Sequence, residues 1–301
     1  MYQIKPRHPL MAALMSTILP GFGQLYNGTV NRGLLVFMAF TLVVIPLVLW
    51  VALYLPTQLT LPLLILTIII NVCIWLYGII DAWKTAKKSS HYTPKNWQIP
   101  GVYLMVFLAA MLFFIPGISQ FIRSNQVESF YIPSASMQPT LLKGDVLFAN
   151  KSYNCPNCLK DVKRGDIAIF VYPNNRTQNF IKRIIALPGD RVSIREQQIF
   201  VNGKSLKSGD TQQRDNMNII NEKTDNAQYQ VQWSADDKAA VEEFVVPNGE
   251  AFVLGDNRSN SNDSRFFGTV PLRDVVGKAS QIWWSRYEGE FRWKRFGLVL
   301  K

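Results

Sequence analysis

The chain has 301 residues, a formal net charge of +11 and two histidines, His8 and His91. Because no histidine follows position 91, the later part of the chain excludes a Ser-His-Asp triad and a histidine-ligated zinc site. The positive charge does not indicate a nucleic-acid partner, because the sequence contains no known nucleic-acid-binding module and many of its cations flank apolar runs. We therefore predict no nucleic-acid partner, no metal and no cofactor.

The first part of the chain contains long apolar runs that predict transmembrane helices. A helix needs ~20 apolar residues to cross a hydrocarbon core, and three runs meet that length almost without charged residues. The lipid bilayer is therefore an expected partner of this part. The predicted spans are residues 33–55, 59–80 and 99–122.

The loop at residues 81–98 sets the expected orientation in the membrane. It carries Lys84, Lys87, Lys88 and Lys95, and loops rich in lysine and arginine stay in the cytoplasm. The third predicted span then leads outward. The rest of the chain is expected on the extracytoplasmic side.

Residues 10–26 are apolar but short, and they contain Pro20 and Gly21. We expect an interfacial or re-entrant hairpin, with a fourth membrane crossing as the alternative. No small-residue cleavage site follows and further spans do, so this segment is not predicted to be a cleavable signal peptide. The stretch PGFGQLYNG within it suggests no chemistry.

After a boundary near residues 121–125 the pattern changes to alternation with period two. Residues 123–301 are therefore predicted to form a mostly β, antiparallel domain, closed or partly closed. Residues 204–241 are polar and poor in β-branched side chains, so we expect a surface insertion there. The predicted strands are residues 144–150, 166–172, 180–187, 198–201, 251–254 and 275–284.

Cys155 and Cys158 form a lone CxxC pair in this domain. Zinc would need two more ligands, and no histidine or other cysteine follows the membrane part. A local disulfide, free thiols and a redox or intermolecular role all remain open for this pair.

A proline-bounded segment around Ser134 and Ser136 is the first candidate for chemistry. Proline disfavours helix for the residue before it, so Ile132 and Gln138 should be extended. An extended segment places Ser134 and Ser136 on one side. Taken alone, the segment is more typical of an ordinary Ser/Pro turn.

Lys182 is the second candidate, because it shares an apolar strand face with Phe180 and Ile184 while Arg183 points the other way. Burial lowers the pKa of a lysine from ~10.4, and a neutral amine can act as a general base. A lysine that protects a sheet edge from aggregation is an alternative interpretation of this pattern.

The third candidate is the loop at residues 255–265, which is rich in Asp, Asn and Ser. Ordinary Asx and Ser turns explain such a composition. A calcium loop is a weaker alternative, because the EF-hand spacing and its closing glutamate are absent.

Four motifs in order resemble the bacterial type I signal peptidase (leader peptidase) family, a Ser/Lys-dyad peptidase family. They cover roughly residues 128–285, and the membrane part has more apolar segments than the family usually has. The motifs are Ser-x-Ser-Met-x-Pro-Thr-Leu from position 134, Arg-Gly-Asp-Ile-x-x-Phe at 164–170, Ile-Lys-Arg with Leu-Pro-Gly-Asp at 181–190, and Gly-Asp-Asn-Arg-x-x-Ser-x-Asp-Ser-Arg at 255–265.

The resemblance implies a role for each matching residue. Ser136 matches the nucleophile, Lys182 the general base, and Ser134 an oxyanion-hole hydroxyl beside the Ser136 N–H. Ser261 matches the serine that orients the lysine amine. The supporting residues implied are Gly255 and Asp256, which pack near the dyad, and the Asp263–Arg265 ion pair.

The implied function is a membrane-bound serine endopeptidase that removes N-terminal signal peptides from preproteins with small residues before the cut. We expect a substrate to pair with residues 130–136 and 178–182. The predicted pocket residues are Phe130, Tyr131, Ile132, Met137 and Ile184, while Trp283 and Trp284 are expected to seat the domain on lipid.

The implied location is the bacterial cytoplasmic (inner) membrane, multi-pass, with the catalytic domain on the periplasmic side. The export translocon is a further expected partner. Three other readings remain: a dedicated peptidase for few substrates, a self-cleaving Ser/Lys repressor-type peptidase, and a non-enzymatic component of an export complex. The membrane spans disfavour the second, and the presence of Ser136, Lys182 and Ser261 disfavours the third.

Overall fold

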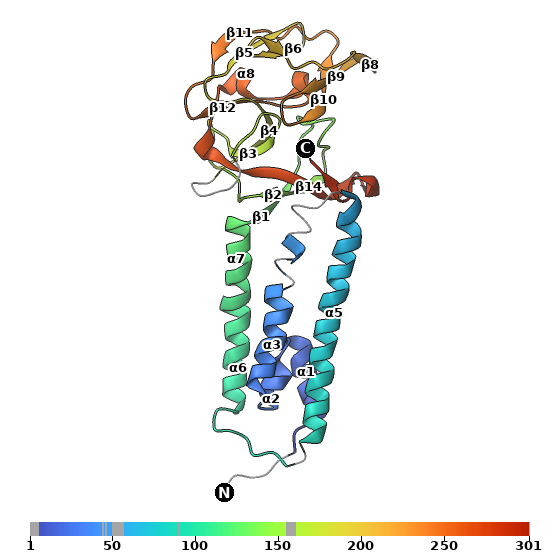
Figure 1. Ribbon diagram of the computed structural model, residues 1–301, viewed down its shortest axis with the longest axis vertical. Coiled ribbons are helices and arrows are strands. Elements are labelled where there is room, and N and C mark those ends of the chain that lie inside the picture. Colours follow the sequence, from blue (N-terminus) through green and yellow to red (C-terminus); the bar gives the residue numbers. More distant parts are fainter. Residues whose placement is uncertain are drawn as a thin grey trace. The chain divides into compact units, whose positions relative to one another are not determined.

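The computed structural model describes residues 6–43, 45, 47–49, 57–89, 91–154 and 161–300. The chain divides into two compact units, Met1–Phe121 and Ile122–Lys301. Figure 1 shows helices in the first unit and mainly strands in the second. Cys155 and Cys158, and with them the predicted alternatives for this pair, lie outside the described residues.

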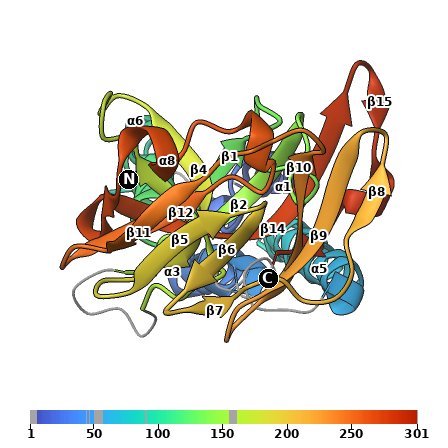
Figure 2. The ribbon, with the colours of Figure 1, turned by 90° about the horizontal axis from the view of Figure 1, so that it is seen from above.

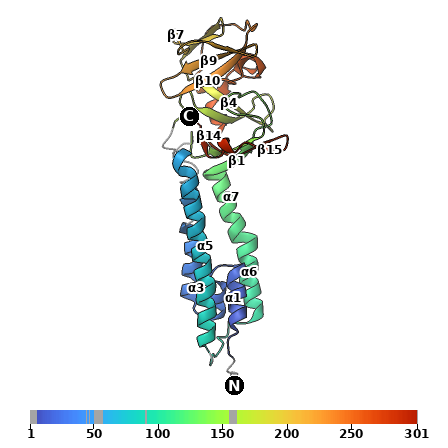
Figure 3. The same cartoon turned by 90° about the vertical axis from the view of Figure 1, so that its right-hand side faces the viewer.

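The first unit contains apolar helices, and in the described residues three spans are long and apolar enough to cross a membrane: Val30–Leu49, Pro62–Lys88 and Pro100–Asn125. They overlap the three predicted spans. Figure 3 shows the long helix α5 beside α3 and α1. The elements are α1 (Pro9–Ile18), α2 (Phe22–Tyr26), α3 (Val30–Met38), η1 (Ala39–Val43), α5 (Thr57–Lys88), α6 (Pro100–Ala109), η2 (Ala110–Phe114) and α7 (Ile115–Asn125), which ends in the second unit.

Residues 10–26 form two short helices instead of one continuous crossing. The chain turns at Gly21, which has a left-handed φ of 86°. The 10-residue helix α1 rises only ~15 Å, about half of a hydrocarbon core. A fourth crossing as a single helix is therefore not formed. The interfacial location of this segment stays a prediction.

The stretch PGFGQLYNG packs these short helices against α5. Gln24 is buried, and its Nε2 donates to the carbonyl of Gly78 at 2.7 Å. Nδ2 of Asn27 donates to the carbonyl of Ala82, also at 2.7 Å. A Cβ on Gly21 would overlap the carbonyl of Gly33. The motif thus supplies hydrogen bonds and close backbone contact between helices, for which its amides and glycines are suited.

The second unit consists of short antiparallel strands in three sheets, as predicted for the fold class. The largest sheet has the order β1-β2-β14-β3-β4-β12-β13 with β15 and β16 paired to β14, a second has β10-β9-β8, and a third has β11-β5-β6-β7. The strands of the largest sheet are β1 (Val127–Tyr131), β2 (Asp145–Asn150), β3 (Ile167–Val171), β4 (Asn179–Ala186), β12 (Glu250–Leu254), β13 (Val270–Pro271), β14 (Val275–Tyr287), β15 (Glu290–Phe291) and β16 (Leu298–Val299).

The six predicted strands are confirmed as β2, β3, β4, β6, β12 and β14. The alternation of apolar and polar residues located them, because each buries one or both faces in one of the core clusters. The prediction missed the strands of the smaller sheets. These are β5 (Arg191–Arg195), β7 (Lys204–Ser205), β8 (Gln212–Arg214), β9 (Met217–Lys223), β10 (Gln228–Ser234) and β11 (Val241–Val245), next to the predicted β6 (Gln198–Val201).

Residues 204–241 are not merely a surface insertion, and that expectation is corrected. Figure 2 shows β8, β9 and β10 side by side. Val231 and Trp233 of β10 are fully buried, and Ile220 of β9 is almost fully buried, in one core cluster with Phe252 of β12. The segment reads as polar because only alternate residues face this core.

Candidate active site

The turn after β1 presents Ser134 and Ser136 from a backbone held on both sides. Ile132 donates its N–H to the carbonyl of Asp145 at 2.8 Å, and its own carbonyl accepts from the N–H of Gly144 at 2.9 Å. Met137, directly after Ser136, is fully buried and packs in the cluster with Leu141 and Leu147. This anchor leaves the two serine hydroxyls 3.2 Å apart at the surface of the domain.

Lys182 lies on β4, and its Nζ is 2.8 Å from Oγ of Ser136. The side chain is 4% exposed. Burial lowers the pKa of Lys182 to about 8, although the carboxylates of Asp263 and Asp256 act in the opposite direction; Arg265 lowers the pKa further. A substantial fraction of this amine is thus neutral near pH 8, next to a hydroxyl from which it can take a proton.

The loop at residues 255–265 packs directly against the backbone of Ser136. The N–H of Asn257 donates to the carbonyl of Ser136 at 3.1 Å, and Nδ2 of Asn257 donates to the carbonyl of Ala135 at 3.2 Å. A Cβ at Gly255 would overlap both the Ser136 carbonyl and Oγ of Ser261. Only glycine fits this close approach of the loop to Ser136.

The predicted supporting ion pair is formed inside this loop. Asp263 is fully buried and accepts from Nε and Nη2 of Arg265 at 2.8 and 2.9 Å. Its Oδ2 also accepts from the N–H of Gly255 at 3.0 Å. Asp256 is paired as well, with Arg183 on β4. The four predicted supporting residues therefore all lie around Ser136 and Lys182, as their sequence motif implies.

Ser261 lies beside Gly255, but its hydroxyl does not reach Lys182 in a hydrogen bond. The side chain is 9% exposed, and its Oγ has no hydrogen-bond partner among the described residues. The orienting role that the resemblance implies for Ser261 thus stays a prediction.

A groove of about 570 Å³ opens beside the two serines. Three of the predicted pocket residues, Phe130, Tyr131 and Ile132, line one wall. Residues 178–182, including Lys182 itself, also line the groove. The remaining lining residues are Pro133, Ser134, Ala135, Ser136, Ile169, Asn260 and Asn262.

Met137 and Ile184 were predicted to line this groove, and both predictions are wrong. Met137 turns away from the serines into the core beneath them. Ile184 lies two residues beyond Lys182 on β4, about 7 Å along the strand. At that point the strand is covered, and Ile184 packs with Phe170 and Val253.

Ile169 and the two asparagines are groove residues that the sequence did not indicate. Ile169 and Ile181 are partners in the β3–β4 register, which is a long-range property of the sheet. Asn260 and Asn262 directly flank Ser261, and that adjacency was the only available signal.

The sequence model of the family described as "Signal peptidase, peptidase S26" matches residues 103–284. The chain belongs to the signal peptidase family. The signal peptidase I of Pseudomonas aeruginosa is 35% identical over 191 residues, covering 54% of this chain and 67% of that protein. The signal peptidase I of Buchnera aphidicola subsp. Baizongia pistaciae is 32% identical over 265 residues, covering 69% and 83%.

Among solved structures, a signal peptidase I from Enterococcus faecalis V583 is 32% identical and covers 40% of this chain and 97% of its own, with a TM-score of 0.29. Membership of the signal peptidase family makes the chain a serine peptidase, a hydrolase. The matched region contains Ser136, Lys182 and Ser261. It leaves the first 102 residues unmatched.

Trp283 and Trp284, the predicted lipid-seating residues, are half-buried in this signal peptidase domain. Trp283 stacks on Phe148 with ring centroids 5.4 Å apart, and its Nε1 donates to Oγ of Ser129 at 3.2 Å. These contacts support the sheet. A role on lipid stays a prediction.

Proposed function

We propose that this protein removes signal peptides from exported preproteins, and that Ser136 and Lys182 are its catalytic dyad. The observation that carries the dyad is the 2.8 Å contact between Nζ of Lys182 and Oγ of Ser136, made by an amine that is almost fully buried. The family of the chain supports the substrate class.

In the proposed acylation step, neutral Lys182 accepts the proton of the Ser136 hydroxyl while Oγ attacks the scissile carbonyl. The tetrahedral intermediate collapses when the resulting ammonium donates a proton to the leaving amine. The mature protein departs with a new N-terminus, and the signal peptide remains as an ester on Ser136. Lys182 then takes a proton from water, which hydrolyses that ester and regenerates the serine.

Ser134 is proposed to stabilise the oxyanion together with the N–H of Ser136. Its hydroxyl lies 3.2 Å from Oγ of Ser136, and both serines line the groove. Ser134→Ala should therefore lower kcat by ~10²–10³-fold with little change in KM. Steady-state kinetics with a preprotein measure this, and an effect on KM alone would contradict the role.

Ser261 is proposed to hold the lysine amine once Ser136 has become an ester. At that stage Nζ loses its serine partner and needs another hydrogen-bonding group. The Ser261 hydroxyl is buried and has no partner in the described part of the chain, a costly state that such a contact would relieve.

The groove supports recognition of an extended peptide through its backbone. β1 is the terminal strand of the largest sheet, so one edge of Phe130 and Tyr131 is open. On β4, the strand β12 pairs only with the part from Arg183 to Ala186. Among the described residues, the edge of β4 that faces β12 therefore has no strand partner at residues 179–182. A substrate lying between these two edges would complete both ladders, and its small side chains would face the groove.

The proposed topology is multi-pass, with the catalytic unit on the periplasmic side of the cytoplasmic membrane. Three helices long enough to span a membrane and a basic loop between the second and third support this topology, because loops rich in lysine and arginine stay in the cytoplasm. Protease added to intact spheroplasts should then digest the region after Asn125 and spare the loop between α5 and α6, which contains Lys95.

The deciding experiment uses the purified full-length chain in detergent micelles with a labelled preprotein. The wild type should cleave it, and sequencing of the new N-terminus should show a cut after a small residue. Ser136→Ala and Lys182→Ala should abolish cleavage while circular dichroism stays unchanged. Lys204→Ala, which changes an exposed lysine of the same unit, is the control and should cleave normally.

Retained turnover in either dyad variant would reject the mechanism, and no cleavage by the wild type would reject the function. Testing several preproteins also separates a general enzyme from a dedicated one. A dedicated enzyme would cleave only one or a few of them.

A further inference from the structure

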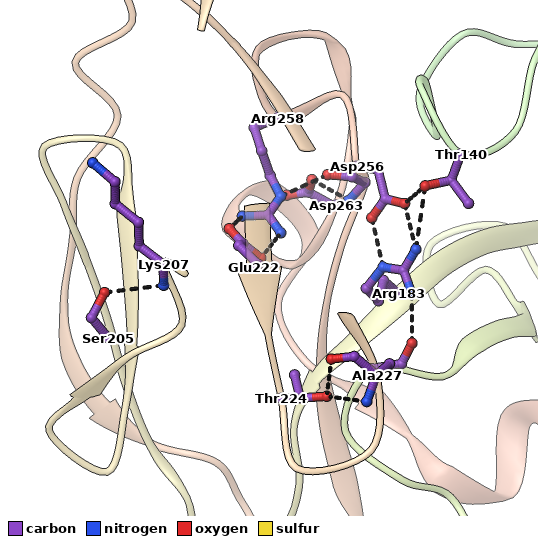
Figure 4. Close-up of polar contacts among 12 residues, drawn as sticks. Thr140, Arg183, Ser205, Lys207, Glu222, Thr224, Ala227, Asp256, Arg258 and Asp263 are labelled. Carbon is purple, nitrogen blue, oxygen red and sulfur yellow. Dashed lines mark hydrogen bonds and ion pairs between the residues drawn. The ribbon is translucent and has the colours of Figure 1, made fainter. Parts of the chain in front are cut away.

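The loop at residues 255–265, which packs against Ser136, is held by a second buried ion pair. The carboxylate of this pair lies in the segment at residues 204–241. Arg258 lies on the short helix η3 (Arg258–Asn260) and is 1% exposed. Its Nη1 and Nη2 donate to the two carboxylate oxygens of Glu222, each at 2.7 Å. Its Nε donates to the carbonyl of Gly255 at 3.0 Å. Figure 4 shows this arrangement from β9 to the loop.

The β9–β10 hairpin makes further contacts with the same loop. The N–H of Gln232 donates to the carbonyl of Asp256 at 2.9 Å, and the N–H of Ser234 donates to Oγ of Ser259 at 2.8 Å. Trp233 is buried, with the guanidinium of Arg258 5.9 Å from its ring centroid. The hairpin therefore contacts the loop through its backbone, one aromatic ring and one ion pair.

The two buried arginines near the dyad lie in one network. Tyr229 is the cross-strand partner of Glu222. The guanidinium of Arg183 lies over the Tyr229 ring, 3.7 Å from the ring centroid. Nε and Nη2 of Arg183 donate to Asp256 at 2.8 and 2.6 Å. The loop is thus fixed to β4 on one side and to β9 on the other.

We propose that Glu222, acting through Arg258, is a positioning residue of the peptidase: the pair holds the loop with Gly255 and Asp263 against Ser136 and Lys182. This inference rests on the proposed dyad. The loop touches the backbone of Ser136 where even one Cβ at Gly255 would not fit. Because this contact is so tight, loosening the loop shifts the nucleophile and admits water to the lysine amine.

The most informative consequence concerns the charge state of Lys182. Its pKa is low mainly because it is buried, while Asp263, Asp256 and Arg265 are the charged groups that act on it. Glu222→Gln keeps the shape of the side chain but leaves Arg258 buried without a counter-charge, which forces the loop to move. Water then reaches Lys182, and its pKa rises toward the ordinary lysine value.

The test measures that titration directly in the full chain in detergent micelles. Lysines labelled with ¹³C at Cε are followed by NMR against pH, and the Lys182 signal is assigned by its loss in Lys182→Met. The wild type should titrate at about 8. In Glu222→Gln, Lys182 should titrate about one pH unit or more higher than in the wild type. Cleavage should therefore fall ~10-fold at pH 7 and much less at pH 10.

Two further variants keep the test decisive. Glu243→Gln makes the same change in an exposed ion pair, Arg191–Glu243 at 3.8 Å, and should behave as the wild type. If Glu222→Gln fails to fold, the double variant Glu222→Leu/Arg258→Met removes both buried charges, which proteins often tolerate. It also removes the tether from β9 to Gly255, so the titration of Lys182 should still move upward.

Folded variants with an unmoved Lys182 titration would overturn the proposal, whatever their activity. A wild type that titrates at about 8 and a Glu222→Gln variant that titrates higher, with no cleavage of a preprotein by either, would instead reject the proposed function and keep the positioning role. A loss of cleavage in Glu222→Gln that is equal at every pH would also overturn the proposal, because it would indicate a structural effect only.

Discussion

Each face of β4 buries one basic side chain, and the two side chains have different partners. Lys182 and Arg183 are neighbours in sequence, both are almost fully buried, and their side chains point to opposite faces of the strand. Arg183 lies in a bidentate ion pair with Asp256 and donates to the carbonyl of Gly165. Lys182 has a serine hydroxyl as its partner and no carboxylate among the described ion pairs.

The difference shows that the partner, and not burial alone, decides what a buried cation does. With the Asp256 carboxylate beside it, Arg183 keeps its charge, and its pKa is raised although burial acts to lower it. Without such a partner, burial prevails at Lys182 and lowers its pKa to about 8. One face of the strand therefore supports structure, and the other holds the amine that we propose as the general base.

The largest effect on cleavage is expected for Lys182→Arg, which gives position 182 the residue type of its neighbour Arg183. In Lys182→Arg the guanidinium stays charged at every accessible pH and cannot act as a base. Cleavage of a preprotein should fall by ~10²–10⁴-fold, the usual contribution of a general base, and should not recover up to pH 10. Recovery at high pH would mean that another group takes the serine proton.

The next largest effect concerns the other face. Arg183→Met leaves Asp256 buried without its counter-charge, which should lower the free energy of unfolding by ~3–5 kcal/mol. Urea denaturation of the detergent-solubilised chain, followed by tryptophan fluorescence, measures this loss. Arg176→Met is the control, because Arg176 also forms a short pair with Asp274, at 2.8 Å, but is 62% exposed. A similar loss of unfolding free energy in both variants would show that burial of the ion pair does not determine the size of the effect.

Removing the buried amine should stabilise the protein. Because the folded pKa of Lys182 is about 8 and the unfolded value is near 10.5, the unfolded state binds more protons between these values. The destabilisation is therefore complete below pH 8 and disappears as the pH rises through 10.5. Lys182→Met should raise the free energy of unfolding at pH 7 by ~2–3 kcal/mol, and this gain should shrink above pH 8. An equal gain at pH 7 and pH 10.5 would exclude protonation as its cause.

The smallest effect is the pH dependence of the wild type. Only the neutral amine acts as a base, so kcat/KM should rise ~10-fold per pH unit below 8 and level off above it. The pH–rate profile between pH 6 and 10 measures this limb. A midpoint near the ordinary lysine value would show that Lys182 is solvated in the free enzyme.

Local patterns in the sequence were sufficient for much of the site. The alternation around Lys182 predicted an amine on an apolar face, and the prolines around Ser134 and Ser136 predicted an extended segment with both hydroxyls on one side. These are properties of a strand or turn a few residues long, so neighbouring residues determine them. The roles of Ser261, Gly255 and Asp263 came from the resemblance of their motif to a family, since the loop alone is compatible with ordinary turns.

The sequence by itself thus determined the long apolar helices, the main strands and the residue types of the proposed dyad. Tertiary structure alone decided that Met137 and Ile184 face the core, that Ile169 meets Ile181 across two strands, and that Glu222 reaches Arg258 from a polar hairpin. The physical reason is that each of these contacts joins residues far apart in the chain or depends on what covers a strand. Periodicity defines the two faces of a strand, but only the packed sheet determines which part of a face remains open.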